Sequence, residues 1–370
     1  MSNIGGKAPL FVVGTPRSGS TLLTSFLASH PNIYSGAETQ FFNKIGLNSC
    51  ELNEVLKTEN WPHQAVRLMN NRLTLSDQSV LELYGKSTRD IQAALSNKEP
   101  SLKAMLESIV ERKRTDSQSR WLEKTPNHLK HLKEIRNEFP SAKIILIHRD
   151  LRDSSVSIPK LPWASNSVIE NAALISSWFV HVDDEFNSPN FLTVSYEKLV
   201  TDSETTLKKV FEFIGEEFDR AVLSRSNATD ITSEGEPWKK DIFGKIDASS
   251  VGRWKKSMLP NLLRQVEAIT GEVLTKLGYE VRNQLDFENI QIKRLRGQKL
   301  TYLDDYVDIL NGNIMALSHF SQSCALIFVE QKLVSRALAA AIKLRLLEKK
   351  TIYFLGKESF ILKTVGKYLR

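Results

Sequence analysis

A loop near the start of the chain has the residue types and the spacing that bind an anionic group. The segment Gly14-Thr15-Pro16-Arg17-Ser18-Gly19-Ser20-Thr21 keeps the G-x-x-x-x-G spacing of a phosphate-binding loop, but Ser20 stands where nucleoside triphosphatases have lysine. Backbone N–H groups at a helix N-terminus still bind anions through unpaired donors and the helix dipole. The loop therefore predicts anion binding without triphosphate chemistry, and Arg17 supplies a cation inside it. A plain turn between a strand and a helix is the alternative.

A second polar segment has the groups needed to bind a phosphate dianion. It runs from His148 to Ser157 and contains two guanidiniums, Arg149 and Arg152, with several hydroxyls. Arginine binds phosphate through a fixed fork of donors, and ligands of open parallel sheets bind beyond the carboxyl ends of the strands. Taken alone, the segment is equally consistent with a solvated helix start that carries Asp–Arg pairs.

The elements that must position these groups alternate between strand and helix. Apolar runs predict strands at 10–13, 143–148 and 191–195, and helical patterns at 20–29, from Pro126 to about Glu138, from a Thr201-x-x-Glu204 capping box to Gly215, and from Pro260 to near Gly278. Strands separated by helices imply a parallel sheet. We therefore predict an α/β, P-loop-like three-layer fold with a central parallel sheet flanked by helices. The segment from Cys50 to Ser119 is expected to be mostly helical and to face the molecule on which the protein acts.

Composition favours a globular protein with anionic partners. Of 370 residues, 41% are hydrophobic and 25% charged, and the net charge is +7. Two cysteines and the absence of a long apolar segment predict a soluble, cytoplasmic protein without a signal peptide or a membrane span. Near residue 282 the sequence becomes basic and mainly helical in its pattern. We therefore predict one domain over 1–281 and a basic, mainly helical C-terminal extension over 282–370, whose role the sequence does not assign.

The chain resembles the PAPS-dependent sulfotransferases at four motifs, which occur in the family's order over roughly residues 8–280. PAPS is 3′-phosphoadenosine-5′-phosphosulfate. The segment from Pro16 to Leu23 is similar to the family's 5′-phosphosulfate loop, and Arg149 and Ser157 have the spacing of its 3′-phosphate pair. Tyr196-Glu197-Lys198-Leu199 resembles the element near the adenine, and Gly252-Arg253-Trp254-Lys255 resembles the late Gly-x-Trp element. Arginine at position 17 resembles the tyrosylprotein, carbohydrate and bacterial branches of the family.

The resemblance implies that the cofactor is PAPS and that its product is 3′,5′-adenosine bisphosphate. The expected cofactor-binding residues are Pro16, Arg17, Ser18, Gly19, Ser20, Thr21, Leu22, Arg149, Ser157, Tyr196, Ser249, Arg253 and Trp254. Two alternatives stay open here: Tyr196 as a core residue at the sheet edge, and Trp254 as a packing anchor.

Sulfuryl transfer needs an aligned acceptor hydroxyl, a base and positive charge near the developing anion. Arg17 is the candidate for that charge. Glu38, in Gly36-Ala37-Glu38-Thr39, resembles the family's base, and Lys124, in Glu123-Lys124-Thr125-Pro126, resembles a lysine near the transferred group. The alternatives are a solvent-facing loop carboxylate for Glu38 and a cation near a helix cap for Lys124.

No zinc-like ligand spacing is present, so no metal is predicted, and His128 and His131 are expected on a solvated helix face. His63 and His181 have no assigned role. The predicted function is sulfuryl transfer to a hydroxyl of a carbohydrate or glycolipid, by in-line displacement with a carboxylate base. The alternatives are a tyrosyl-peptide sulfotransferase and a P-loop kinase or NTPase. Nucleic acid is not an expected partner; peripheral membrane contact through the basic tail and the oligomeric state stay open.

Overall fold

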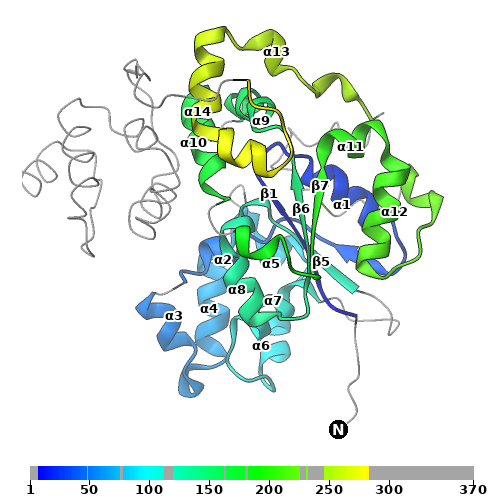
Figure 1. Ribbon diagram of the computed structural model, residues 1–370. Helices are drawn as coiled ribbons and strands as arrows, with labels where there is room; N and C mark the ends of the chain where they lie inside the picture. Colours follow the sequence, from blue (N-terminus) through cyan, green and yellow to red (C-terminus); the bar gives the residue numbers. More distant parts are fainter. Residues whose placement is uncertain are drawn as a thin grey trace, which may run out of the picture. The chain divides into compact units, whose positions relative to one another are not determined.

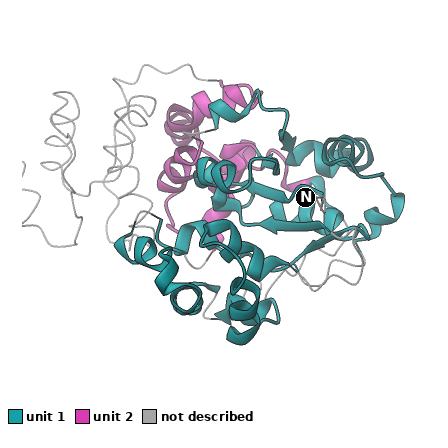
Figure 2. Ribbon diagram, turned by 90° about the horizontal axis from the view of Figure 1, so that it is seen from below, with its two compact units in different colours: residues 1–149, 181–248 teal, residues 150–180, 249–370 magenta. Residues whose placement is uncertain are grey.

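The computed structural model describes residues 7–47, 49–75, 78–111, 120–161, 164–179, 182–225, 231 and 246–282. The chain divides into two compact units, one made of residues 1–149 and 181–248 and the other of residues 150–180 and 249–370 (Figure 2). The expected extension lies outside the described residues except for Arg282, and so does His181. No helix in the described part of the chain is both long enough and apolar enough to cross a lipid bilayer.

A parallel sheet forms the centre of the first unit. Its described strands are β1 (Leu10–Gly14), β2 (Ile33–Ser35), β5 (Arg120–Lys124), β6 (Lys143–His148) and β7 (Phe191–Ser195), in the order β2-β5-β1-β6-β7 (Figure 1). Every neighbouring pair in this sheet is parallel. The strands predicted from apolar runs are β1, β6 and β7, and the α/β fold with a central parallel sheet is confirmed.

The sequence did not predict β2 or β5. For β5, this failure has a physical reason. Its sequence, Arg-Trp-Leu-Glu-Lys, is mostly charged, yet all five residues are buried. The charges have partners inside the unit: Arg120 donates to the carbonyl of Ile214 at 2.8 Å, and Lys124 pairs with Glu38. A buried strand normally appears as an apolar run, so a strand whose charges are satisfied internally gives no such signal.

Helices cover both faces of this sheet. On one face, α1 (Ser20–Ala28) and α12 (Ser203–Ile214) pack their apolar side chains against alternate residues of β1, such as Leu10 and Val12 (Figure 1). On the other face, Phe11 contacts the rings of Trp121 and Phe139, each with centroids 5.5 Å away. Burial on both faces explains why β1 is continuously apolar.

Two predicted helix starts differ from the structure. Residues Pro126–His131 form a 3-10 helix, η2, before α8 (Leu132–Glu138). The expected capping box is wrong, because Thr201 is the last residue of α11 (Tyr196–Thr201) and Asp202 caps α12 by accepting from the N–H of Thr205 at 3.3 Å. The predicted end of α12 at Gly215 is confirmed by its left-handed φ of 74°.

The rest of the first unit is mostly helical between β2 and β5, as predicted for Cys50 to Ser119 in so far as the structure describes it. The elements are α2 (Phe41–Lys44), α3 (Cys50–Val55), α4 (His63–Arg72), the hairpin β3 (Thr74–Leu75) and β4 (Gln78–Ser79), α5 (Val80–Leu83), α6 (Thr88–Leu95) and α7 (Leu102–Val110). Further 3-10 helices of the chain are η1 (Thr58–Asn60), η3 (Ile158–Lys160), η4 (Asp183–Glu185), η5 (Arg220–Ser224) and η7 (Ala248–Ser250).

The second unit is helical over its described residues. It contains α9 (Leu151–Ser157), α10 (Val168–Ser177), α13 (Trp254–Ser257) and α14 (Pro260–Lys276), and its core includes Ala172, Trp254, Val266 and Ile269. The helix predicted to open at Pro260 is confirmed.

Candidate active site

The carboxyl ends of the sheet strands carry the predicted site residues of the first unit. The phosphate loop follows β1, Glu38 follows β2, Lys124 ends β5, Arg149 follows β6 and Tyr196 follows β7. β1 connects onward to β2 on one side of it, whereas its neighbour β6 connects onward to β7 on the other side, so the connections leave these two adjacent strands in opposite directions. This is a topological switch point, where open parallel sheets bind their ligands.

The phosphate loop has a backbone that its sequence dictates. Gly19 has a φ of 91°, and a Cβ there would meet the ring of Tyr196, so this position requires glycine. Thr15 Oγ1 and Ser18 Oγ are buried and have no hydrogen-bond partner among the described residues. Two buried hydroxyls in need of a partner, next to the start of α1, fit an anionic ligand with oxygen acceptors.

Arg149 connects the ends of β6 and β7 with the phosphate loop. Its side chain donates through Nη1 to the carbonyl of Arg17 at 3.3 Å, and its guanidinium lies 4.8 Å from the centre of the Tyr196 ring. Tyr196 is half-buried at the start of α11, so its interpretation as a core residue of the sheet edge is wrong. Three predicted cofactor residues from three strand ends therefore meet.

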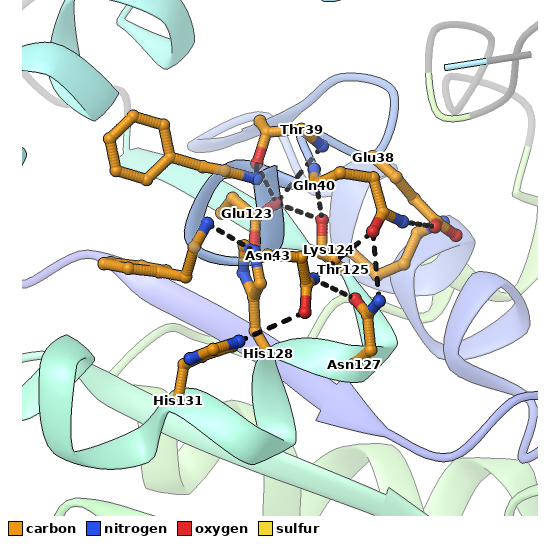
Figure 3. Close-up of polar contacts among 12 residues, drawn as sticks. Glu38, Thr39, Gln40, Asn43, Glu123, Lys124, Thr125, Asn127, His128 and His131 are labelled. Carbon is orange, nitrogen blue, oxygen red and sulfur yellow. Dashed lines mark hydrogen bonds and ion pairs between the residues drawn. The ribbon is translucent and has the colours of Figure 1, made fainter. Parts of the chain in front are cut away.

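Glu38 and Lys124 form an ion pair inside the unit (Figure 3). Lys124 Nζ lies 2.7 Å from Glu38 Oε1, and the exposed fractions of the two side chains are 0% and 9%. The other carboxylate oxygen of Glu38 accepts from Gln40 Nε2 at 2.9 Å. The alternative for Glu38 is thereby wrong, because its side chain does not face solvent. Lys124 is the last residue of β5 and directly precedes Thr125, the N-cap of η2, but its ammonium is paired with Glu38.

Glu123 is a buried residue at which several hydrogen bonds meet, and the sequence did not indicate this role. Its Oε1 accepts from the hydroxyls of Thr39 at 2.7 Å and Thr125 at 2.6 Å, and its Oε2 contacts His128 Nδ1 at 2.9 Å (Figure 3). Burial by itself would raise the pKa of Glu123, but the attraction of His128 and the hydrogen bonds hold this pKa below its ordinary value. His128 is fully buried, so its expected place on a solvated face is wrong.

A row of polar side chains continues from Glu38 (Figure 3). Asn127 Nδ2 donates to Gln40 Oε1 at 3.1 Å, and Asn43 Nδ2 donates to Asn127 Oδ1 at 2.6 Å. His131 Nε2 lies 3.1 Å from Asn43 Oδ1. Burial holds the pKa of His131 well below its ordinary value, so its neutral ring donates to Asn43. No motif in the sequence indicated this row.

Tyr84 fixes the loop that carries Glu38. Its hydroxyl donates to the carbonyl of Ala37 at 2.8 Å, and its ring lies where a Cβ on Gly36 would stand. Burial, followed by the negative charges of Glu123 and Glu38, raises the pKa of Tyr84 well above its ordinary value. Tyr84 is therefore a neutral donor.

The second unit brings together other predicted cofactor residues. Arg253 donates to the carbonyl of Ser249 at 3.2 Å, and Ser157 is the last residue of α9. Trp254 is buried with Arg152 4.0 Å above its ring, so it does act as a packing anchor. Asp153 accepts from the N–H groups of Gly252 at 2.7 Å and Trp254 at 2.8 Å, which fixes this turn to α9.

Within the ranges that the structure describes, no group of three or more His, Cys, Asp or Glu side chains could hold a metal ion.

Comparison with known proteins identifies the family. A sequence model described as the sulfotransferase family matches residues 9–220, which is more than half of the chain. The chain belongs to the sulfotransferase family. This confirms the enzyme class predicted from the motifs and leaves the kinase interpretation without support.

Individual sulfotransferases are similar over most of this chain. Protein-tyrosine sulfotransferase A of Caenorhabditis elegans is 23% identical over 285 residues, covering 73% of this chain and 67% of the worm protein. Protein-tyrosine sulfotransferase 1 of Danio rerio is 24% identical over 283 residues, covering 73% and 72%. The sulfotransferase domain of the Synechococcus PCC 7002 olefin synthase has the same fold, with 21% identity, a TM-score of 0.50, and 74% of this chain and 96% of that chain covered.

Proposed function

We propose that this sulfotransferase uses PAPS as its donor and a hydroxyl group of a second molecule as its acceptor. The observation that carries the proposal is the buried Glu38–Lys124 pair, which lies in the same unit as the phosphate loop and at the same edge of the sheet. When bound, PAPS would supply an activated sulfuryl group: the acceptor oxygen would form a bond to its sulfur, and 3′,5′-adenosine bisphosphate would leave.

The residues of the first unit have separate roles in this proposal. The loop residues Ser18, Gly19, Ser20, Thr21 and Leu22 hold the 5′ end through N–H groups and hydroxyls, and Thr15 adds a second buried hydroxyl. Pro16 has no N–H to donate and contributes its fixed φ to the loop. Arg149 and Tyr196 hold the 3′-phosphate and the adenine. Ser157, Ser249 and Arg253, which belong to the second unit, stay predicted cofactor contacts. Arg17 stabilises negative charge as it develops.

The Glu38–Lys124 pair supports proton transfer from the acceptor. Glu38 receives the proton of the acceptor hydroxyl, and the ammonium of Lys124, 2.7 Å from its carboxylate, orients it. The same ammonium adds positive charge beside the reacting oxygen.

The first candidate for the acceptor is a carbohydrate or the sugar of a glycolipid. The row formed by Gln40, Asn43 and Asn127 beside Glu38 supports this choice, because side-chain amides donate to and accept from hydroxyl groups. A tyrosyl peptide is the second candidate, favoured by the similarity to proteins named protein-tyrosine sulfotransferases. Transfer of radioactive sulfate from PAPS to oligosaccharides, glycolipids and tyrosyl peptides, assayed in parallel, distinguishes them.

Calorimetric titration tests the cofactor. The purified chain should bind 3′,5′-adenosine bisphosphate and bind ATP with Mg²⁺ only weakly. Arg149→Ala should weaken bisphosphate binding by roughly 1.5–3 kcal/mol, because a charge-assisted interaction is lost. A preference for ATP, or binding of neither nucleotide, overturns the proposal.

Glu38→Gln tests the base. The variant should keep its affinity for the bisphosphate and lose turnover by about 100-fold or more, which is the usual contribution of general-base catalysis. Glu134→Gln, at a partly exposed carboxylate of α8, is the matched control and should keep turnover. Retained turnover in Glu38→Gln removes this residue from the mechanism.

A further inference from the structure

We propose that Glu123 is a positioning residue: its carboxylate, together with His128, fixes the segment from Thr39 to Phe42 and thereby sets Glu38 against Lys124. This inference rests on the proposed function of Glu38 as the base. Glu123 itself is fully buried, and the structure gives it no contact with the amide row beside Glu38.

Two adjacent residues of the Glu38 loop bond two adjacent residues of β5. Glu38 accepts from Lys124 at 2.7 Å, and the hydroxyl of Thr39 donates to Glu123 at 2.7 Å. Successive side chains of a strand point to opposite faces, so these two bonds hold the loop from opposite sides of β5. A third bond, from the N–H of Gln40 to Thr125 Oγ1 at 3.2 Å, adds to this attachment.

The network requires a carboxylate at position 123. The Thr39 hydroxyl accepts from the N–H of Phe41 at 3.2 Å and the Thr125 hydroxyl accepts from the N–H of Gln40, so each hydroxyl turns its proton toward Glu123. An ionised carboxylate accepts at both oxygens, whereas an amide must turn its NH₂ toward a donor. Glutamine at position 123 would therefore lose a bond on one side or the other.

His128 extends the same network to the start of α2. Its Nε2 accepts from the N–H of Phe42 at 3.2 Å, so its proton lies on Nδ1 and is donated to Glu123 at 2.9 Å. Glu123 and His128 together thus anchor the chain on both sides of Gln40, whose φ of 52° is unusual for a residue with a Cβ. The segment keeps this conformation because its neighbours on both sides are fixed.

The chain offers a matched control that contacts the same strand. Glu216 is also a buried carboxylate, and it accepts from Lys7 at 2.8 Å, Asn32 at 3.2 Å and Arg120 at 3.4 Å. Arg120 is the first residue of β5, whereas Lys124 is the last, so this cluster lies at the other end of the strand. Glu216→Gln should reduce stability without disturbing the Glu38–Lys124 pair.

The experiment compares Glu123→Gln with Glu216→Gln in the full chain. We expect both variants to have a lower melting temperature and to bind 3′,5′-adenosine bisphosphate within about twofold of the unchanged protein. Only Glu123→Gln should lower kcat, by roughly 10- to 100-fold, because small displacements of a catalytic group cost this much. Its acid-side midpoint of activity should also move to higher pH, because the Lys124 ammonium no longer lies next to Glu38.

Thr39→Val keeps the test decisive if Glu123→Gln does not fold. This variant removes one donor to Glu123 at nearly constant volume, and it should lower kcat by about tenfold with the same shift in the pH profile. Equal loss of kcat in Glu123→Gln and Glu216→Gln, or turnover and a pH profile like those of the unchanged protein, overturns the inference.

Glu38→Gln is assayed in the same series to separate the two proposals. An inactive Glu38→Gln with a fully active Glu123→Gln contradicts only the positioning role. An active Glu38→Gln contradicts the proposed base, and the positioning role with it.

Discussion

Arg17 has a left-handed backbone conformation inside the phosphate loop, with a φ of 65°. Such a conformation costs a residue with a Cβ about 1–2 kcal/mol relative to glycine. Glycine would remove this cost, but it would also remove the cation. The strain at this position is therefore consistent with selection of the guanidinium for its charge.

Substitutions at Arg17 should separate stability from function. Arg17→Ala and Arg17→Gly should both abolish turnover, and the glycine variant should be more stable than the alanine variant by about 1 kcal/mol. Denaturant unfolding with a sulfate-transfer assay measures both effects. Arg225, which has a φ of 55° and lies outside the predicted site, is the control, because its glycine variant should gain stability over alanine and keep turnover. Equal stability of the two Arg17 variants would show that the loop carries no strain.

His148 ends β6 immediately before Arg149, and burial lowers its pKa to about 4. The unfolded chain has the ordinary histidine pKa near 6.5, so the unfolded state binds a proton more tightly than the folded state does. The neutral imidazole therefore contributes its full stability above pH 6.5, and this contribution is lost as the pH falls from 6.5 to about 4.

His148→Gln should therefore flatten the acid side of the stability profile. Between pH 7 and pH 5 the variant should lose about 2 kcal/mol less of its free energy of unfolding than the unchanged protein. Denaturant unfolding at a series of pH values measures this difference. His63→Gln, at an exposed histidine, is the control. A profile with the same slope in His148→Gln would contradict the burial effect.

At the scale of elements, the apolar strands were predictable and the charged strand was not. β1, β6 and β7 could be predicted because each appears in the sequence as an apolar run or has a clear end signal. β5 could not be found this way, because its stability depends on partners far away in sequence, such as Glu216 for Arg120 and Glu38 for Lys124. Local patterns do not contain that information.

The residues of the candidate site also divide into those that the sequence could predict and those that it could not. Residues in local motifs, such as Arg17 and Arg149, could be predicted because spacing and the order of the elements indicate a strand end. Glu123 and His128 could not, because their importance comes from bonds to Thr39 and Phe42 across the sheet. The domain boundaries at 281 and 282 stay predictions, because the extension lies outside the part of the chain that the structure describes.

The turn at Gly252 to Trp254 depends on one acceptor in α9. Asp153→Ala should leave the N–H groups of Gly252 and Trp254 without their carboxylate partner and lower the free energy of unfolding by about 2–4 kcal/mol. Asp153→Asn should have a smaller effect, because its amide keeps one acceptor oxygen. Thermal unfolding of the three proteins gives the order, and an Asp153→Ala variant as stable as the unchanged protein would contradict it.

The whole molecule carries a net charge of +7, which attracts an anionic cofactor beyond the contacts of individual residues. Dissolved salt screens this attraction, with a Debye length of about 10 Å at 0.1 M and about 3 Å at 1 M. The Kd for 3′,5′-adenosine bisphosphate should therefore rise about fivefold to tenfold between 0.05 M and 0.5 M NaCl. Adenosine, which is uncharged, is the control ligand. A Kd independent of salt would show that direct hydrogen bonds alone hold the bisphosphate.

The charges of β5 have a consequence for how the sheet chooses its alignment. A slip of one residue turns every side chain of a strand to the opposite face. In an apolar strand such a slip exchanges one hydrocarbon surface for another, but in β5 it would separate Arg120, Glu123 and Lys124 from their partners and bury three uncompensated charges. The native alignment is the one in which each buried charge meets its partner, so the residues that serve the site also reject mispaired forms of the sheet.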